Sequence, residues 1–161
     1  MAEKFLEYLS ETEKILSRTD HLVYITLPML KNKRLLIKVI TDITEAVLKN
    51  INAILHYEYI KKRINLVKES SINLDTFFVK CAPSYRVNES ELEGIKKLLV
   101  LSKAHKTSPF EFIKDGRLVI LSDSLSSETM AIEKIKEFLA ISKSLLNKTK
   151  IKIKEENLGK V

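Results

Sequence analysis

A row of polar side chains in the middle of the chain holds the residues best suited to chemistry. They follow one another at intervals of three and four, which places them on one face of a helix: Asp42, Glu45, Lys49, Asn52, His56, Tyr59 and Arg63. In this row, Lys49 and His56 combine a fixed cation with an imidazole that can exchange protons near neutral pH. The simpler interpretation is the solvated face of a long helix, in which Glu45 and Lys49 form a weak i,i+4 ion pair.

The segment from Lys49 to Tyr57 resembles the Arg-x4–6-His motif of the HEPN (higher-eukaryote-and-prokaryote nucleotide-binding) helical proteins. Many members of that family are ribonucleases that act as dimers, with the arginine and the histidine facing an RNA phosphate across the dimer cleft. The resemblance implies that His56 exchanges a proton with a ribose 2′-hydroxyl while Lys49, in the arginine position, steadies the phosphate. Lysine departs from the family pattern, because it lacks the planar fork with which arginine binds a phosphate through two donors.

The rest of the sequence offers no further site, so we expect no metal ion, no cofactor and no other catalytic residue. None of the three histidines has a second ligand at the H-x3-H spacing of a helical zinc site. The three glycines, at positions 94, 116 and 159, are too scattered for a phosphate-binding loop. The lone Cys81 follows an apolar segment, which predicts a buried structural thiol.

The charge of the chain allows a nucleic-acid partner. The formal net charge is +7, a surplus that permits contact with phosphates without requiring it. The candidate phosphate contacts are basic residues in two short groups, Lys61, Lys62 and Arg63 and then Lys150, Lys152 and Lys154. Few aromatic side chains lie among them, so such a contact would involve phosphates alone and would weaken with salt.

Length and hydropathy restrict the class of protein. The 161 residues suffice for one domain, and the low content of Gly and Pro argues against an all-β fold. The longest uncharged run, His21 to Leu30, is much shorter than the ~20 residues that span a membrane. Acidic residues interrupt the first turns, unlike a signal peptide. We therefore expect a cytoplasmic protein with no membrane partner.

The region from Arg34 to Arg63 predicts one long central helix. Apolar residues recur there at steps of three and four and form a stripe consisting of Leu36, Ile40, Ile43, Val47, Ile51 and Ile54. The apolar arc is wide enough for neighbours on two sides. The stripe fails after Tyr57, where Glu58 and Lys61 occupy the next core positions, so we expect the last turns to project beyond the bundle. Asn50, at the edge of the arc, predicts a buried polar group bonded to a neighbouring helix.

The remaining elements complete an all-α fold, a bundle of five to seven helices around this central helix. Helices are expected over 2–18, 74–82, 88–105 and 124–146, the third starting at a capping box formed by Asn88 and Glu91. The segment 108–116 has the cap, proline and glycine of a short helix, which we favour, although flanking apolar runs also fit a hairpin. Residues 118–121 suggest a small β-like patch. We expect one domain over 1–147 and a basic, mobile tail over 148–161.

These features together predict a non-enzymatic helical module for binding or assembly. Self-association through the projecting end of the central helix is the expected mode, and a homo-oligomer or another protein the expected partner. The alternative is an RNA-binding or HEPN-like RNA-cleaving module that uses Lys49 and His56 on the exposed face of that helix.

Overall fold

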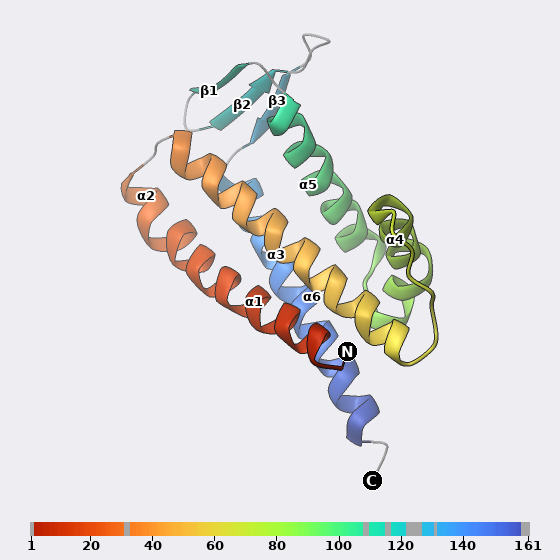
Figure 1. Cartoon of the computed structure of the whole chain (residues 1–161). Coiled ribbons are helices and arrows are strands. Elements are labelled where there is room, and N and C mark those ends of the chain that lie inside the picture. Colours follow the sequence, from red (N-terminus) through yellow and green to blue (C-terminus); the bar gives the residue numbers. More distant parts are fainter. Residues whose placement is uncertain are drawn as a thin grey trace.

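The middle of the chain forms one unbroken helix, as its apolar stripe predicts. The computed structural model describes residues 2–30, 33–107, 110–114, 117–121, 127–130 and 132–158, and in it this helix is α3 (Lys33–Ile60) (Figure 1). All stripe residues are buried, with at most 2% of each exposed: Leu36, Ile40, Ile43, Val47, Ile51 and Ile54. The predicted inner face of the central helix is therefore confirmed.

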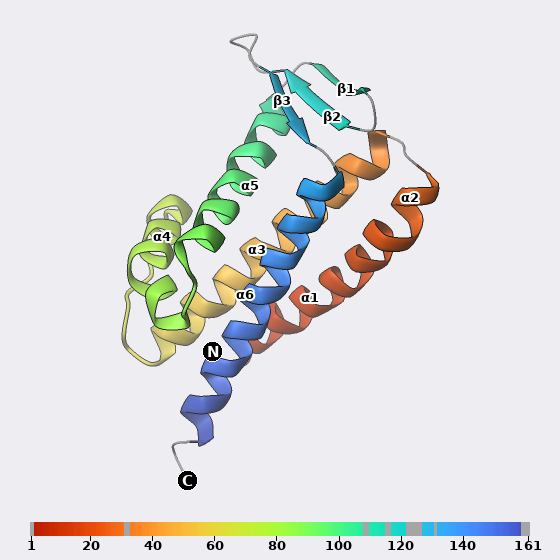
Figure 2. The ribbon, with the colours of Figure 1, turned by 180° about the vertical axis from the view of Figure 1, so that it is seen from behind.

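Three other long helices pack against α3 in the described part of the chain. They are α1 (Ala2–His21), α5 (Glu89–Thr107) and α6 (Ile132–Leu158). Figure 2 shows α6 crossing in front of α3, with α5 on one side of it and α1 on the other. The fold belongs to the all-α class, since the buried residues of these four helices supply most of the core.

Hydrogen bonds between side chains show in which direction α6 runs relative to α3. Asn50 bonds Thr149 and Tyr57 bonds Glu156, and each pair is 99 positions apart in the chain. A constant separation means that the two helices run parallel and in register. Each of the pairs α1–α3 and α5–α6 is antiparallel, and so is the pair α1–α6 (Figure 1).

Short helical segments connect the long helices. They are the π-helical turn η1 (Leu22–Thr26), α2 (Leu27–Met29), α4 (Ser70–Thr76), the π-helical turn η2 (Phe77–Cys81) and the 3₁₀ turn η3 (Ala82–Tyr85). Pro28 stands inside α2, which ends one residue later, and Pro83 occupies the first turn of η3. Proline is tolerated in a first turn, where its missing N–H would have no partner. The expected short helix over 74–82 is thus present as three successive segments.

A small antiparallel sheet lies at the end of the bundle where α5 ends and α6 begins (Figure 1). Its strands, in the order β1-β2-β3, are β1 (Phe110–Lys114), β2 (Arg117–Leu121) and β3 (Ser127–Met130). Phe110 pairs with Leu121, and Lys114 pairs with Arg117. The short helix that we favoured over 108–116 is wrong, because residues 110–114 pair with β2 as the first arm of a hairpin.

The expected mobile tail is also wrong for most of its length. Residues 148–158 continue α6, which ends at Leu158, and residues 159–161 lie outside the described ranges. Thr149 is fully buried and Ile153 is 8% exposed, so this part of α6 contributes to the core. The alternation of lysines with other residues concealed a helical face with Leu145, Thr149 and Ile153 pointing inward. The boundary that we placed at residue 147 therefore falls inside a helix.

Helix α5 starts at the predicted capping box and lies close to α6. The backbone N–H of Glu91 donates to Asn88 Oδ1 at 2.8 Å, and the N–H of Asn88 donates to Glu91 Oε1 at 3.2 Å. The same carboxylate accepts hydrogen bonds from Ser144 and Lys148 of α6. A β-carbon at position 94 would overlap the Cδ1 methyl of Ile141, so Gly94 permits the close approach of the two helices.

The buried pair Asn50–Thr149 confirms the expected role of Asn50 and leads to a first prediction. Asn50 Nδ2 donates to Thr149 Oγ1 at 2.8 Å, and the hydroxyl in turn donates to the carbonyl of Leu145 at 2.7 Å. Thr149→Val keeps the shape of the side chain but leaves the Asn50 amide without a partner. It should therefore lower the free energy of unfolding, measured with urea, by ~1–3 kcal/mol. The double variant Asn50→Leu/Thr149→Val should recover most of that loss. Equal losses in both variants would contradict a hydrogen-bond origin.

Candidate functional site

The predicted catalytic pair lies where α1 packs on α3. Lys49 Nζ is 2.6 Å from Glu11 Oε2 and 4.0 Å from Glu45 Oε1. The hydrogen bond to Glu11 raises the pKa of Lys49, because it stabilises the ammonium form. The ammonium is therefore already paired with a carboxylate of α1, and about a quarter of the Lys49 side chain is exposed.

His56 is half-buried against α1, whereas the sequence suggested a fully exposed face. Its ring centroid is 5.4 Å from that of Tyr8, and the Tyr8 ring is also 6.0 Å from Lys49 Nζ. Burial lowers the pKa of His56, and the nearby Lys4 lowers it further. Seven residues of helix separate the Cα atoms of Lys49 and His56 by about 10 Å. The two side chains thus lie beside the same tyrosine ring, and the Lys49 ammonium is already paired with Glu11.

The lowered pKa of His56 predicts a dependence of stability on pH. The unfolded chain, with its histidine near the ordinary pKa of 6.5, binds more protons than the folded chain over the interval below that value. The free energy of unfolding should therefore fall as the pH drops from about 6.5 towards the folded-state pKa. His56→Phe keeps a ring beside Tyr8 and should flatten this part of the profile in chemical denaturation from pH 7.5 to 5. An unchanged slope in His56→Phe would assign the effect to another group.

The first group of predicted phosphate contacts belongs to the structure of the end of α3. Arg63 binds both oxygens of Glu58 through Nε and Nη2, and Nη2 also donates to Glu156 Oε1 at 2.9 Å. Glu58 is 4% exposed, so the turn after α3 folds a cation back over a buried carboxylate. Lys62 makes this turn possible, with a left-handed φ of 62°. Lys61 lies 5.5 Å above the Tyr57 ring.

This arrangement corrects the expectation that the last turns of α3 project from the bundle. The helix ends at Ile60, and the charged residue that interrupts its apolar stripe is paired in the interior. The hydroxyl of Tyr57 donates to Glu156 at 2.7 Å, and burial raises the pKa of Tyr57 to about 12. Burial also works to raise the pKa of Glu156, but hydrogen bonds from Arg63 and Tyr57 outweigh it and lower that pKa.

Two buried groups border the ionic cluster formed by Glu58, Arg63 and Glu156. Burial and the nearby Glu58 carboxylate raise the pKa of the Tyr85 phenol. They raise the pKa of the Cys81 thiol to about 11 as well, so the thiol stays protonated and unreactive at neutral pH. Cys81 is 1% exposed, which confirms the structural role expected of it.

The second group of predicted phosphate contacts divides between two sides of α6. Lys150 and Lys154 face α1, where Lys150 pairs with Glu13. Lys152 faces η3, where Nζ is 3.2 Å from the carbonyl oxygen of Ser84. Lys150 and Lys154 thus lie on a different side of α6 from Lys152, which is close to Glu156, the carboxylate that Arg63 binds.

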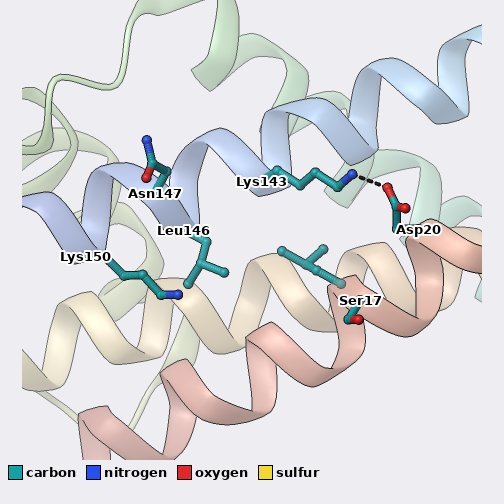
Figure 3. Close-up of a pocket in the computed structure, with 7 residues that line it drawn as sticks. Ser17, Asp20, Lys143, Leu146, Asn147 and Lys150 are labelled. Carbon is teal, nitrogen blue, oxygen red and sulfur yellow. Dashed lines mark hydrogen bonds and ion pairs between the residues drawn. The ribbon is translucent and has the colours of Figure 1, made fainter.

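A groove between α1 and α6 is the feature that the sequence did not suggest. Two ion pairs bridge it, Asp20 with Lys143 (Figure 3) and Glu13 with Lys150. Glu13 lies seven residues before Asp20, and Lys150 lies seven residues after Lys143. This spacing is expected where two antiparallel helices face each other with residues that repeat every seven positions. One more step of seven brings Leu6 opposite Asn157, and both line the groove.

Two hollows occupy the intervals between these cross-groove positions. The first, of about 340 Å³, is lined by the buried Leu16 and Leu146 and by Ser17. Figure 3 shows the Leu146 side chain pointing from α6 towards α1. The second, of about 520 Å³, is lined by Leu6, Leu9, Ser10, Glu13, Lys150, Ile153, Lys154 and Asn157. Ser10 and Ser17 are too small to fill the space beside their neighbours. The groove thus presents two similar apolar-floored hollows one heptad apart, about 10 Å along the helix.

The part of the chain that the structure describes holds no metal site and no membrane span. No cluster of three or more His, Cys, Asp or Glu side chains in those ranges could bind a metal ion. None of the described helices combines the length and apolar character needed to cross a bilayer. Comparisons with protein-family models, with curated proteins and with solved structures found no match for this chain.

Proposed function

We propose that this chain is a non-enzymatic binding module that holds a helix of a partner protein in the groove between α1 and α6. The observation that carries the proposal is the pair of apolar-floored hollows separated by one heptad. A helix that presents large apolar side chains at positions i and i+7 would place one in each hollow, as in helix-in-groove recognition.

The charges of the groove favour an acidic partner helix. Lys143 and Lys150 pair across the groove with carboxylates of α1, but Lys154, on the rim of the second hollow, has no ion pair within the described residues. Exposed ion pairs contribute at most ~1 kcal/mol, so the Glu13–Lys150 bridge between the hollows can open at little cost. Glutamates flanking the apolar anchors of the partner would then pair with the lysines of α6.

A designed peptide tests this proposal without knowledge of the natural partner. The probe is a lactam-stapled helix of about 18 residues with leucines at positions i and i+7 and glutamates beside them. We expect it to bind in fluorescence anisotropy, and replacing either leucine with alanine should weaken binding by ~10-fold or more. Equal binding of a peptide with both leucines replaced by serine would overturn the proposal.

Self-association is a special case of the same proposal. The reason given by the sequence, a projecting end of α3, does not apply, because Glu58 is buried and paired with Arg63. A second copy could instead place its acidic α1 over the basic α6 of the first around a two-fold axis, since the two helices border one groove. Sedimentation at tens of micromolar, with Lys150→Glu as the disrupting variant, distinguishes this from a different partner.

The alternative of RNA cleavage by Lys49 and His56 has less physical support. A general base works best with a pKa near the working pH, and a phosphate needs a cation free to receive it. Here the pKa of His56 is lowered and Lys49 is bound to Glu11. We expect mixed RNA to remain intact on incubation with the protein. Cleavage that disappears in His56→Ala would favour the alternative.

A further inference from the structure

A third hollow lies on the opposite side of α6 from the groove between α1 and α6, which we call the partner groove. Its volume is about 290 Å³, and it opens between η3 and α6. The 3₁₀ turn η3 supplies Ser84 and Tyr85, and the next residue is Arg86; α6 supplies Asn147, Lys148, Ile151, Lys152 and Glu155. This size is at the lower end for ligand pockets, which suits one small charged group better than a large apolar ligand.

Two cations border this hollow without carboxylate partners of their own. Arg86 is exposed and makes no ion pair within the described residues. Lys152 Nζ is held by neutral groups, 3.2 Å from the carbonyl oxygen of Ser84 and 5.5 Å from the Tyr85 ring centroid. Glu156, one turn further along α6, is close enough for Lys152 to help lower its pKa, but its carboxylate already accepts hydrogen bonds from Arg63 and Tyr57. The positive charge of Arg86 and Lys152 therefore remains available to an anion.

The backbone fixes Arg86 at this place. Its φ of 59° lies in the left-handed region, which residues other than glycine seldom adopt. The N–H of Arg86 donates to the carbonyl of Pro83, and that of Val87 donates to the carbonyl of Ala82, both at 3.2 Å. Two hydrogen bonds thus close the turn and hold the Arg86 backbone at the mouth of the hollow, opposite Lys152.

We propose that this hollow binds a phosphate group of a small phosphorylated molecule. A guanidinium gives two parallel donors to phosphate oxygens, and an ammonium on the far side adds a point charge. The Asn147 amide at the rim can donate a further hydrogen bond. Lys148 is paired with Glu91, and Glu155 is the one carboxylate of the lining, so the balance of the lining favours an anion.

Calorimetric titration with pyrophosphate tests the site. We expect binding that weakens as salt increases, and a loss of ~10-fold or more in Arg86→Gln and in Lys152→Gln. The control is Lys97→Gln, an equal loss of charge at an exposed position of α5 that lines none of the three hollows described above, which should bind like the parent chain. Equal affinities of Arg86→Gln, Lys152→Gln and Lys97→Gln, or no binding by the parent chain, would overturn the proposal.

Two further measurements locate and identify the ligand. Pyrophosphate should shift the backbone amide NMR signals of Ser84, Arg86 and Asn147 in the unaltered chain, which covers the case that a variant does not fold. Inorganic phosphate, adenosine triphosphate and a single-stranded oligoribonucleotide are compared in the same titration. Binding of the oligoribonucleotide alone would reject a small-molecule site. The helical peptide should bind equally well with and without pyrophosphate, so the two proposals can fail separately.

Discussion

Arg63→Met is expected to lower the free energy of unfolding by about 3 kcal/mol, which for a chain of this size is a fall of about 6–12 °C in Tm. The substitution removes the cation that binds Glu58 and Glu156 and leaves the Glu58 carboxylate buried without a charged partner. About two-fifths of the Arg63 side chain is exposed, which places the expected loss at the lower end of the range for breaking a buried pair. Urea and thermal unfolding followed by circular dichroism provide the measurement.

Two variants separate the ionic cluster from general effects at this turn. Lys62→Met removes a neighbouring exposed charge and should change stability by less than ~0.5 kcal/mol. Glu58→Gln/Arg63→Met removes both charges of the buried pair and should recover part of the loss, because no buried carboxylate is then left alone. If Lys62→Met costs as much as Arg63→Met, the loss comes from the turn and not from the ion pair.

The cluster should also make the stability fall in acid. The pKa of Glu156 is lowered in the folded chain from its ordinary value of 4.5, so the folded state binds fewer protons in the window below that value. Its contribution is fully present above pH 4.5 and is lost as the pH falls through the lowered pKa. Arg63→Met removes the principal donor to Glu156, and the acid branch of its stability profile should therefore be flatter than that of the parent chain.

Local patterns predicted the helices well because each pattern and its cause lie within one element. The stripe from Leu36 to Ile54 repeats with the helical period, and every one of its residues is buried. The capping box of Asn88 and Glu91 depends on two residues three positions apart. Secondary structure was misread where two periods competed, as at 110–114, whose apolar residues fit a strand or a short helix equally well.

The burial of Glu58 could not be predicted, because its partner Arg63 comes from an irregular segment and also binds a distant second carboxylate, Glu156. Arg63 reaches it only through the left-handed residue Lys62, and Glu156 lies 93 positions after Arg63. A charge at a core position looks like the end of a buried face unless those partners are known. The end of α6 was misread for a related reason: Thr149 counts as polar in a hydropathy pattern, yet it is buried beside Asn50.

The partner groove was missed because it belongs to two helices whose pairing no local pattern reveals. Each helix does carry a signal at heptad spacing, Ser10 and Ser17 on α1 and Lys143 and Lys150 on α6. Once α1 and α6 are known to be antiparallel, these rows place ion pairs and hollows in alternation. The candidate site therefore required the tertiary fold, whereas Lys49 and His56 were found from one helix alone.

Filling the hollows is expected to stabilise the chain and to abolish peptide binding. Ser10→Leu and Ser17→Leu each place an apolar side chain over a floor that is already apolar, Leu9 with Ile153 and Leu16 with Leu146. Each variant should raise the free energy of unfolding by ~1 kcal/mol, or about 2–4 °C in Tm, as other cavity-filling substitutions do. The affinity of the double variant for the stapled peptide should fall by more than ~10-fold, because the new leucines occupy the places of the anchoring leucines of the peptide.

A matched substitution distinguishes this effect from a general gain in hydrophobicity. Ser71→Leu makes the same change at an exposed position of α4, away from the groove, and should leave peptide affinity unchanged. If Ser10→Leu/Ser17→Leu is more stable but still binds the peptide, the peptide binds elsewhere and the proposed function fails. If the double variant is less stable, the serines are needed for the packing of α1 on α6. In that case stability and binding fall together, and only a loss of affinity without a loss of stability identifies a docking surface.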